Sequence, residues 1–135
     1  MMYKFEKEPV SGMILVHIVL DGIHKFKMML DTGASNTTFD ITPLYLAKYP
    51  IGNIIETGIV ETASGMMEID VIETKTISAF GHTVCGLKVQ MYDFLKHGII
   101  SDYHGLLGLD FFKNTKFCID MNNQTIEVVS VKGLK

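Results

Sequence analysis

Apolar residues fall in short runs along the chain, and polar or glycine-containing breaks separate these runs. Residues 13–20 form a β-branched, apolar run, and Asp21-Gly22 is typical of a tight hairpin turn. Residues 23–31 then return with an apolar residue at every second or third position. The pattern predicts a hairpin whose second strand ends at Asp31.

The later runs predict further short strands and two brief helices. Residues 44–49 should form a helix after Thr42 as N-cap and Pro43 as first helical residue. Residues 111–115 should begin a second helix, with Asp110 as its N-cap. Strands are expected over residues 36–41, 53–60, 69–77, 84–91, 106–107, 116–121 and 125–129. With no repeat or linker, this succession predicts one mostly-β, barrel-like domain over residues 1–135.

Composition narrows the class of protein. The chain has 135 residues, 47% of them hydrophobic and 20% charged, which is enough apolar material for one core. A net charge of -3 argues against general binding to nucleic acid or to an anionic membrane, because both need a basic surface. All twelve basic residues are lysines, so arginine contacts to phosphates or bases are excluded.

The sequence also predicts where the protein is found. No apolar run reaches the length of a membrane span, and the first ten residues mix lysine with glutamate and lack the apolar core of a signal peptide. We therefore expect a soluble, cytoplasmic protein, although a leader removed earlier would leave no trace. Cys85 and Cys118 are interpreted as buried apolar residues rather than as a disulfide. The five histidines lack the spacing of metal ligands, so no metal site is predicted.

The stretch around Asp31 carries the candidate chemistry. A carboxylate stands directly after the apolar run Met28-Met29-Leu30, where aspartate is an unusual choice. The glycine turn that follows lets backbone amides approach the carboxylate closely. Two interpretations are open at this point: Asp31 reacts, or it caps a turn by accepting hydrogen bonds from nearby amides.

The residues Asp31, Thr32, Gly33, Ala34 and Ser35 together resemble the active-site motif of the aspartic peptidases. Pepsin-like members of that group carry two such motifs in one chain. This chain carries one Asp-Thr-Gly and no Asp-Ser-Gly. It therefore resembles the retroviral type, the retropepsin-like enzymes, in which two identical chains each contribute one motif.

A second stretch strengthens the resemblance. Retropepsin-like enzymes have two apolar residues and a glycine before a short helix, and Gly105-Leu106-Leu107-Gly108 stands in the corresponding place. The resemblance implies that Leu106, Leu107 and Gly108 form a loop that supports the active site. It also implies a closed β-barrel, the acid protease fold, in a single lobe with one or two short helices.

The hairpin tip over residues 61–68 corresponds in position to the flap that covers a bound peptide in retropepsin-like enzymes. The resemblance assigns Ala63, Ser64, Gly65 and Met66 to that flap. Any exposed hairpin tip would use similar small residues, so the assignment rests on position. A flap of this kind excludes water and orders the substrate.

The resemblance implies hydrolysis of peptide bonds by a homodimer. Two Asp31 carboxylates that meet across the dimer axis cannot both ionise, so they share one proton. The ionised member accepts a proton from the attacking water, and the protonated member donates a hydrogen bond to the carbonyl oxygen. The substrate is then a peptide or protein, and no metal or cofactor is needed. The alternative is a non-catalytic peptide-binding or interaction module that keeps this fold.

Two positions depart from the retroviral pattern. Many retroviral enzymes have an acidic residue where this chain has Ser35 and an arginine where it has Leu109, and these two form an ion pair near the dimer interface. Cellular and bacterial relatives commonly show Asp-Thr-Gly-Ala-Ser, so the catalytic interpretation is unaffected. The departure leaves open how the dimer is held together.

Overall fold

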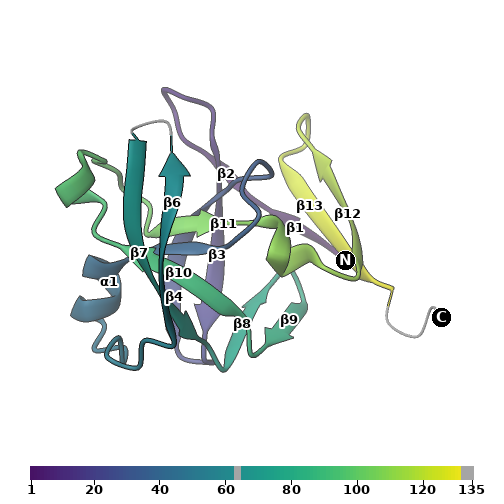
Figure 1. The fold of residues 1–135 in the computed structure, drawn as a ribbon. Helices are drawn as coiled ribbons and strands as arrows, with labels where there is room; N and C mark the ends of the chain where they lie inside the picture. Colours follow the sequence, from purple (N-terminus) through teal and green to yellow (C-terminus); the bar gives the residue numbers. More distant parts are fainter. Residues whose placement is uncertain (63–64, 132–135) are drawn as a thin grey trace.

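The computed structural model describes residues 1–62 and 65–131, and strands dominate it (Figure 1). The strands are β1 (Met2–Lys4), β2 (Glu6–Lys7), β3 (Ile14–Leu20), β4 (His24–Leu30), β5 (Thr38–Asp40), β6 (Glu56–Thr62), β7 (Gly65–Glu73), β8 (Thr76–Ala79), β9 (His82–Cys85), β10 (Lys88–Tyr92), β11 (Gly105–Leu107), β12 (Thr115–Asp120) and β13 (Thr125–Ser130). The helical elements are α1 (Ile41–Leu46) and two 3-10 helices, η1 (Leu95–His97) and η2 (Leu109–Phe112). The mostly-β prediction is therefore confirmed.

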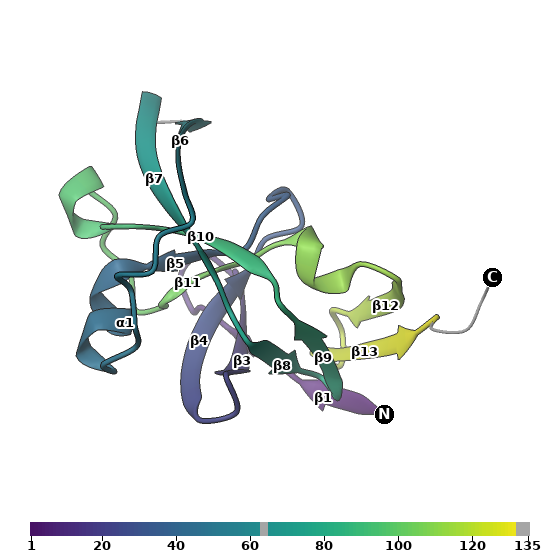
Figure 2. The same cartoon turned by 60° about the horizontal axis from the view of Figure 1, so that its bottom comes forward.

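The strands form two sheets. The larger sheet has the order β6-β7-β10-β5-β11-β4-β3-β8-β9, with β2 paired to β3, and the smaller sheet has the order β1-β13-β12. The β6–β7 hairpin stands at one end of the molecule and the small sheet at the other (Figures 1 and 2). Within the described residues no pairing joins β6 to β9, so the closed barrel that the resemblance implies is not confirmed.

Short β11 organises the centre of the large sheet. It runs parallel to β4, with Leu107 beside Leu30, and antiparallel to β5, with Gly105 beside Phe39. Every second residue of β3 and β4 points into the core, because side chains alternate between the two faces of a strand. Leu107 is completely buried there. The end of β4 therefore lies against a strand that is distant in sequence.

The predicted helix boundaries are wrong in both cases. Helix α1 begins at Ile41 with Asp40 as N-cap, and the Asp40 carboxylate accepts a hydrogen bond from the Thr42 amide at 3.4 Å. The same carboxylate accepts one from the Phe94 amide at 3.2 Å, a tertiary contact that local sequence does not reveal. Gly108, rather than Asp110, is the N-cap of η2.

Two further expectations also fail. The predicted strand over residues 84–91 is divided into β9 and β10, because Gly86 adopts a left-handed backbone conformation with φ of 67° and turns the chain. Cys85 and Cys118 are exposed and unpaired, rather than buried. Both lie on strands at the edge of their sheets, where one side of the strand faces solvent.

The Asp21 carboxylate connects three distant segments. One oxygen accepts hydrogen bonds from the amides of Lys75 and Thr76, at 2.9 and 3.1 Å, and the other accepts from the Tyr49 hydroxyl at 2.9 Å. Burial of the phenol, together with the hydrogen bond to Asp21 and its charge, raises the pKa of Tyr49, which therefore stays a donor. The predicted turn at Asp21 thus also ties the start of β8 and the end of α1 to the β3–β4 hairpin.

Replacing Asp21 should therefore destabilise the fold more than removing one of its partners. We expect Asp21→Ala to lower the free energy of unfolding by about 2 to 3 kcal/mol, since three donors lose a charged acceptor. Tyr49→Phe removes one of these bonds and should cost about 1 kcal/mol. Urea denaturation of both variants measures the difference. Equal losses in the two variants would contradict a role for the amides of Lys75 and Thr76.

Candidate active site

Asp31 follows the last residue of β4, and a tight turn surrounds its carboxylate. The Asp31 amide donates to the carbonyl of Leu107 at 3.0 Å, which extends the pairing of β4 with β11 by one residue. Carboxylate oxygen Oδ1 accepts from the Gly33 amide at 2.9 Å, and the Asp31 carbonyl accepts from the Ala34 amide at 3.1 Å. The residue as a whole is partly exposed. Backbone contacts therefore hold Asp31 in place at a position that solvent reaches in part.

The loop over residues 31–37 is hydrogen-bonded to the chain around Gly108. The resemblance implied that Leu106, Leu107 and Gly108 support this loop. The Leu109 amide donates to the Ala34 carbonyl at 2.8 Å. An added Cβ at Gly108 would lie 2.9 Å from that same carbonyl oxygen and 2.8 Å from the carbonyl carbon of Asn36, closer than side-chain carbons approach in folded proteins. Glycine is therefore required at position 108 for the two segments to approach so closely.

The far end of the loop is held by a buried side-chain contact that sequence reasoning missed. Thr37 is fully buried, and its amide and hydroxyl donate to the two carboxylate oxygens of Asp110, at 2.9 and 2.7 Å. The same hydroxyl accepts a hydrogen bond from the Gly108 amide at 3.1 Å. Asp110 binds the loop and does not cap a helix. No local signal separates these two uses of an aspartate at the start of a helix.

The structure places part of the predicted flap. Gly65 and Met66 begin β7, and the Met66 side chain is exposed, as expected for a hairpin tip. Ala63 and Ser64 lie outside the described residues. A cavity of about 360 Å³ is lined by Ile59, Val60, Ile69, Val71 and Gln90 of strands β6, β7 and β10, and by Asn36. The base of the hairpin and the Asp31 loop thus border a common cavity.

Tyr103, two residues before β11, is within electrostatic reach of Asp31. Burial raises the pKa of Tyr103, and the negative charge of Asp31 raises it further, followed by that of Asp102. Tyr103 therefore stays protonated within electrostatic reach of Asp31. No pattern over residues 92–104 predicted a role for Tyr103 or for its neighbour His104.

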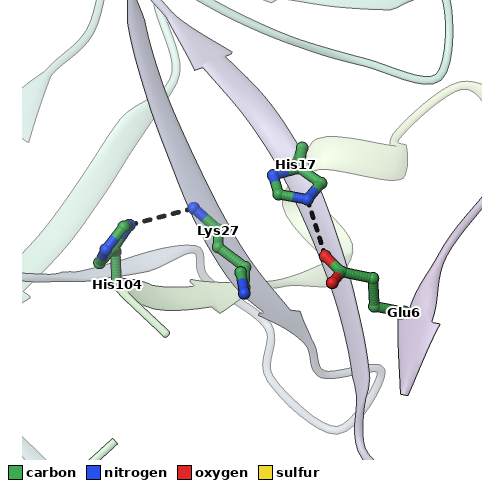
Figure 3. Close-up of polar contacts among 4 residues, drawn as sticks. All are labelled: Glu6, His17, Lys27 and His104. Atoms are coloured by element: carbon green, nitrogen blue, oxygen red, sulfur yellow. Dashed lines mark hydrogen bonds and ion pairs between the residues drawn. The ribbon is translucent and has the colours of Figure 1, made fainter. Parts of the chain in front are cut away.

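His104 joins β4 to β5 through both its backbone and its side chain. Ring atom Nδ1 accepts from the Lys27 amide at 3.0 Å (Figure 3), and the His104 amide donates to the Lys27 carbonyl at 2.7 Å. The His104 carbonyl accepts from the Asp40 amide at 2.9 Å. Burial lowers the pKa of His104 below its ordinary value of 6.5, the Lys27 charge lowers it further, and Asp40 opposes both.

A family model described as aspartyl protease matches residues 16–111, which include both loops. The chain belongs to the aspartyl protease family. A retropepsin-like aspartic protease from Rickettsia conorii has a similar structure, with a TM-score of 0.67 and 19% sequence identity. The match covers 96% of this chain and 92% of that chain, and it shows that the fold is retropepsin-like. No curated protein matches the sequence.

In this member of the aspartyl protease family, the structure brings Leu106, Leu107 and Gly108 next to the Asp31 stretch. Leu106 and Leu107 pair with Met29 and Leu30, and Gly108 contacts the loop after Asp31. Thr32, Gly33 and Ser35 are exposed, so this part of the loop is accessible to another molecule. No helix among the described residues is long and apolar enough to span a membrane.

The lowered pKa of His104 predicts a loss of stability in weak acid. Below pH 6.5 the unfolded chain binds a proton on this ring more readily than the folded protein, which needs neutral Nδ1 as an acceptor. The stabilisation is therefore present above pH 6.5 and is lost as the pH falls toward the lower folded value. We expect the urea midpoint to fall more between pH 7.5 and 5.5 in the native protein than in His104→Asn.

The asparagine variant is the matched control, because its side-chain oxygen can accept from Lys27 but does not titrate. The exposed contact between His17 and Glu6, 2.8 Å apart (Figure 3), is present in both proteins, so its contribution cancels in the comparison. Equal pH dependence of the two proteins would show that His104 does not contribute.

Proposed function

We propose that this protein is an aspartic endopeptidase that acts as a homodimer, with Asp31 as its catalytic residue. The observation that carries the proposal is the position of Asp31, which is held at a strand end by backbone contacts with the loop that includes Leu107 and is still partly exposed. Membership of the aspartyl protease family supports the same chemistry. The fit of Gly108 against the loop supports the assignment of Leu106, Leu107 and Gly108 as the supporting residues.

The proposed reaction needs two copies of Asp31, and one chain supplies one. Two carboxylates about 3 Å apart hold a single proton between them. The ionised member takes a proton from water while the water oxygen bonds to the peptide carbonyl carbon. The protonated member donates a hydrogen bond to the carbonyl oxygen that gains charge. Transfer of a proton to the peptide nitrogen then allows the carbon–nitrogen bond to break.

Neighbouring residues have supporting roles in this proposal. The Thr32 hydroxyl reaches the backbone of the partner chain, and Gly33 leaves room for the substrate to approach. Ala34 and Ser35 complete the loop. The hairpin tip with Ala63, Ser64, Gly65 and Met66 closes over the bound peptide and excludes water. The cytoplasmic location and the single domain over residues 1–135 stay predictions.

Replacing Asp31 tests the proposal directly. Asp31→Asn keeps the shape of the side chain but removes the shared proton, so we expect peptidase activity to fall on the order of 1,000-fold or more. The measurement is cleavage of a peptide library by the native protein and the variant between pH 3 and 7. A statine-type inhibitor, which mimics the transition state, should block the native activity.

Sedimentation of the same samples tests the requirement for two copies. Activity should follow the dimer fraction as the protein is diluted, because each active site needs two chains. A monomer that cleaves peptides as fast per chain would contradict the shared site. Binding of a protein partner that is unchanged in Asp31→Asn, with no cleavage by the native protein, would support the interaction module instead.

A further inference from the structure

We propose that Asp110 is a positioning residue for the reaction, because it fixes the loop that carries Asp31 by holding Thr37. The inference rests on the proposed peptidase activity. Asp110 lies outside the Asp-Thr-Gly stretch and takes no part in the chemistry described above. Both of its carboxylate oxygens nevertheless accept hydrogen bonds from one loop residue, Thr37, at 2.7 and 2.9 Å. The Asp110 carboxylate therefore fixes the end of the loop together with the backbone bond from Gln90 to Thr37.

Both ends of the loop have backbone hydrogen bonds, and the far end also has a side-chain acceptor. Backbone hydrogen bonds hold the first part, from the Asp31 amide to Leu107 and from the Leu109 amide to Ala34. The last part has one backbone bond, from the Gln90 amide to the Thr37 carbonyl at 3.0 Å, and in addition the Asp110 carboxylate, which binds the fully buried Thr37. Hydrogen bonds to a carboxylate are stronger than those between neutral groups, and burial strengthens them further.

The Thr37 hydroxyl connects the two segments because it has one proton and two lone pairs. Its proton is donated to Asp110, so the Gly108 amide is left to donate to a lone pair of the same oxygen, at 3.1 Å. Asp110 thereby sets the orientation of the hydroxyl, and the hydroxyl sets the distance from Gly108 to the loop. Removing the carboxylate leaves both donors of Thr37 buried without that acceptor.

Asp110 acts through Thr37 and does not line the cavity beside the hairpin. It lines a different cavity, of about 350 Å³, together with Cys85 of β9, Lys113 and Asn114. Neither Asp110 nor these neighbours line the cavity between Asn36 and the hairpin strands. A direct contact between Asp110 and the peptide is therefore not part of the proposal.

A small displacement of Asp31 would reduce the rate without weakening binding. Reacting groups must be held close to their productive geometry, and a shift of about 1 Å can cost on the order of 100-fold in rate. In the proposed complex the substrate is bound by the hairpin and by the cavity beside it, and the lining of that cavity includes neither Thr37 nor Asp110. A purely structural role would instead lower the amount of folded protein and leave kcat per folded molecule unchanged.

Three variants separate these possibilities. Thr37→Val has nearly the same shape but lacks the hydroxyl, Thr37→Ser keeps the hydroxyl, and Asp110→Asn removes the charge. We expect kcat to fall about 10- to 100-fold in Thr37→Val and Asp110→Asn, with KM within about 2-fold of native. Thr37→Ser should keep kcat within about 3-fold.

Thr74→Val is the matched control for the loss of a buried threonine hydrogen bond. Thr74 is 2% exposed, and its hydroxyl donates to the Leu87 carbonyl at 2.8 Å, in a turn that holds none of the proposed site residues. Its substitution should lower the urea midpoint and leave kcat unchanged. Circular dichroism under assay conditions measures whether each variant is folded. If Thr37→Val does not fold, the comparison is made with Asp110→Asn.

Hydrogen exchange gives a second measurement that needs no catalysis. The Gly33 amide donates to the Asp31 carboxylate, so its exchange should become faster in Thr37→Val and Asp110→Asn but not in Thr74→Val. If the native protein cleaves no peptide, the exchange rate of the Gly33 amide still shows whether Thr37 and Asp110 hold Asp31 in place. This result does not depend on the proposed function. Three results would overturn the inference. The first is that kcat and the exchange rate both stay unchanged in Thr37→Val and Asp110→Asn, and the second is that only KM changes. The third is that Thr37→Ser loses as much kcat as Thr37→Val.

Discussion

The position of β11 between β4 and β5 is the constraint on which the candidate site depends. Its parallel pairing with β4 fixes where Asp31 leaves the sheet, and its antiparallel pairing with β5 fixes where the loop returns. The fit is close: a Cβ added at Gly105 would lie 2.2 Å from the Thr38 carbonyl oxygen. Only glycine allows this approach, because any other residue would push the two strands apart.

Local patterns predicted the parts of the fold that short segments determine. The turn at Asp21 and the strands beside it follow from alternation and turn chemistry alone, and the Asp31 stretch was recognised by its resemblance to a known motif. The Thr37–Asp110 contact could not be predicted, since an aspartate before a helix is as well suited to cap it as to bind a distant threonine. Asp40 shows the same limit, because its contact with Phe94 depends on tertiary structure.

Ser35 and Leu109, the two departures from the retroviral pattern, lie on loops that the backbone connects. Ser35 is exposed, and Leu109, at 43% exposure, occupies the position at which many retroviral enzymes have arginine. The connection between these loops within the chain does not depend on that side chain, because the Leu109 backbone amide donates to the Ala34 carbonyl. Any residue but proline can make this bond. The family loop geometry is therefore compatible with the loss of the ion pair.

The segments that build the site are remote from one another along the chain. Lys27 and His104, which begin the contact between β4 and the β11 stretch, are 77 positions apart, and Thr37 is 73 positions from Asp110. Closing loops of this length costs entropy before any contact compensates for it, so such pairings form slowly. During synthesis Asp31 emerges long before the residues that position it. Until the β11 stretch has been made and has folded against β4, the Asp31 loop lacks the contacts that hold it in place.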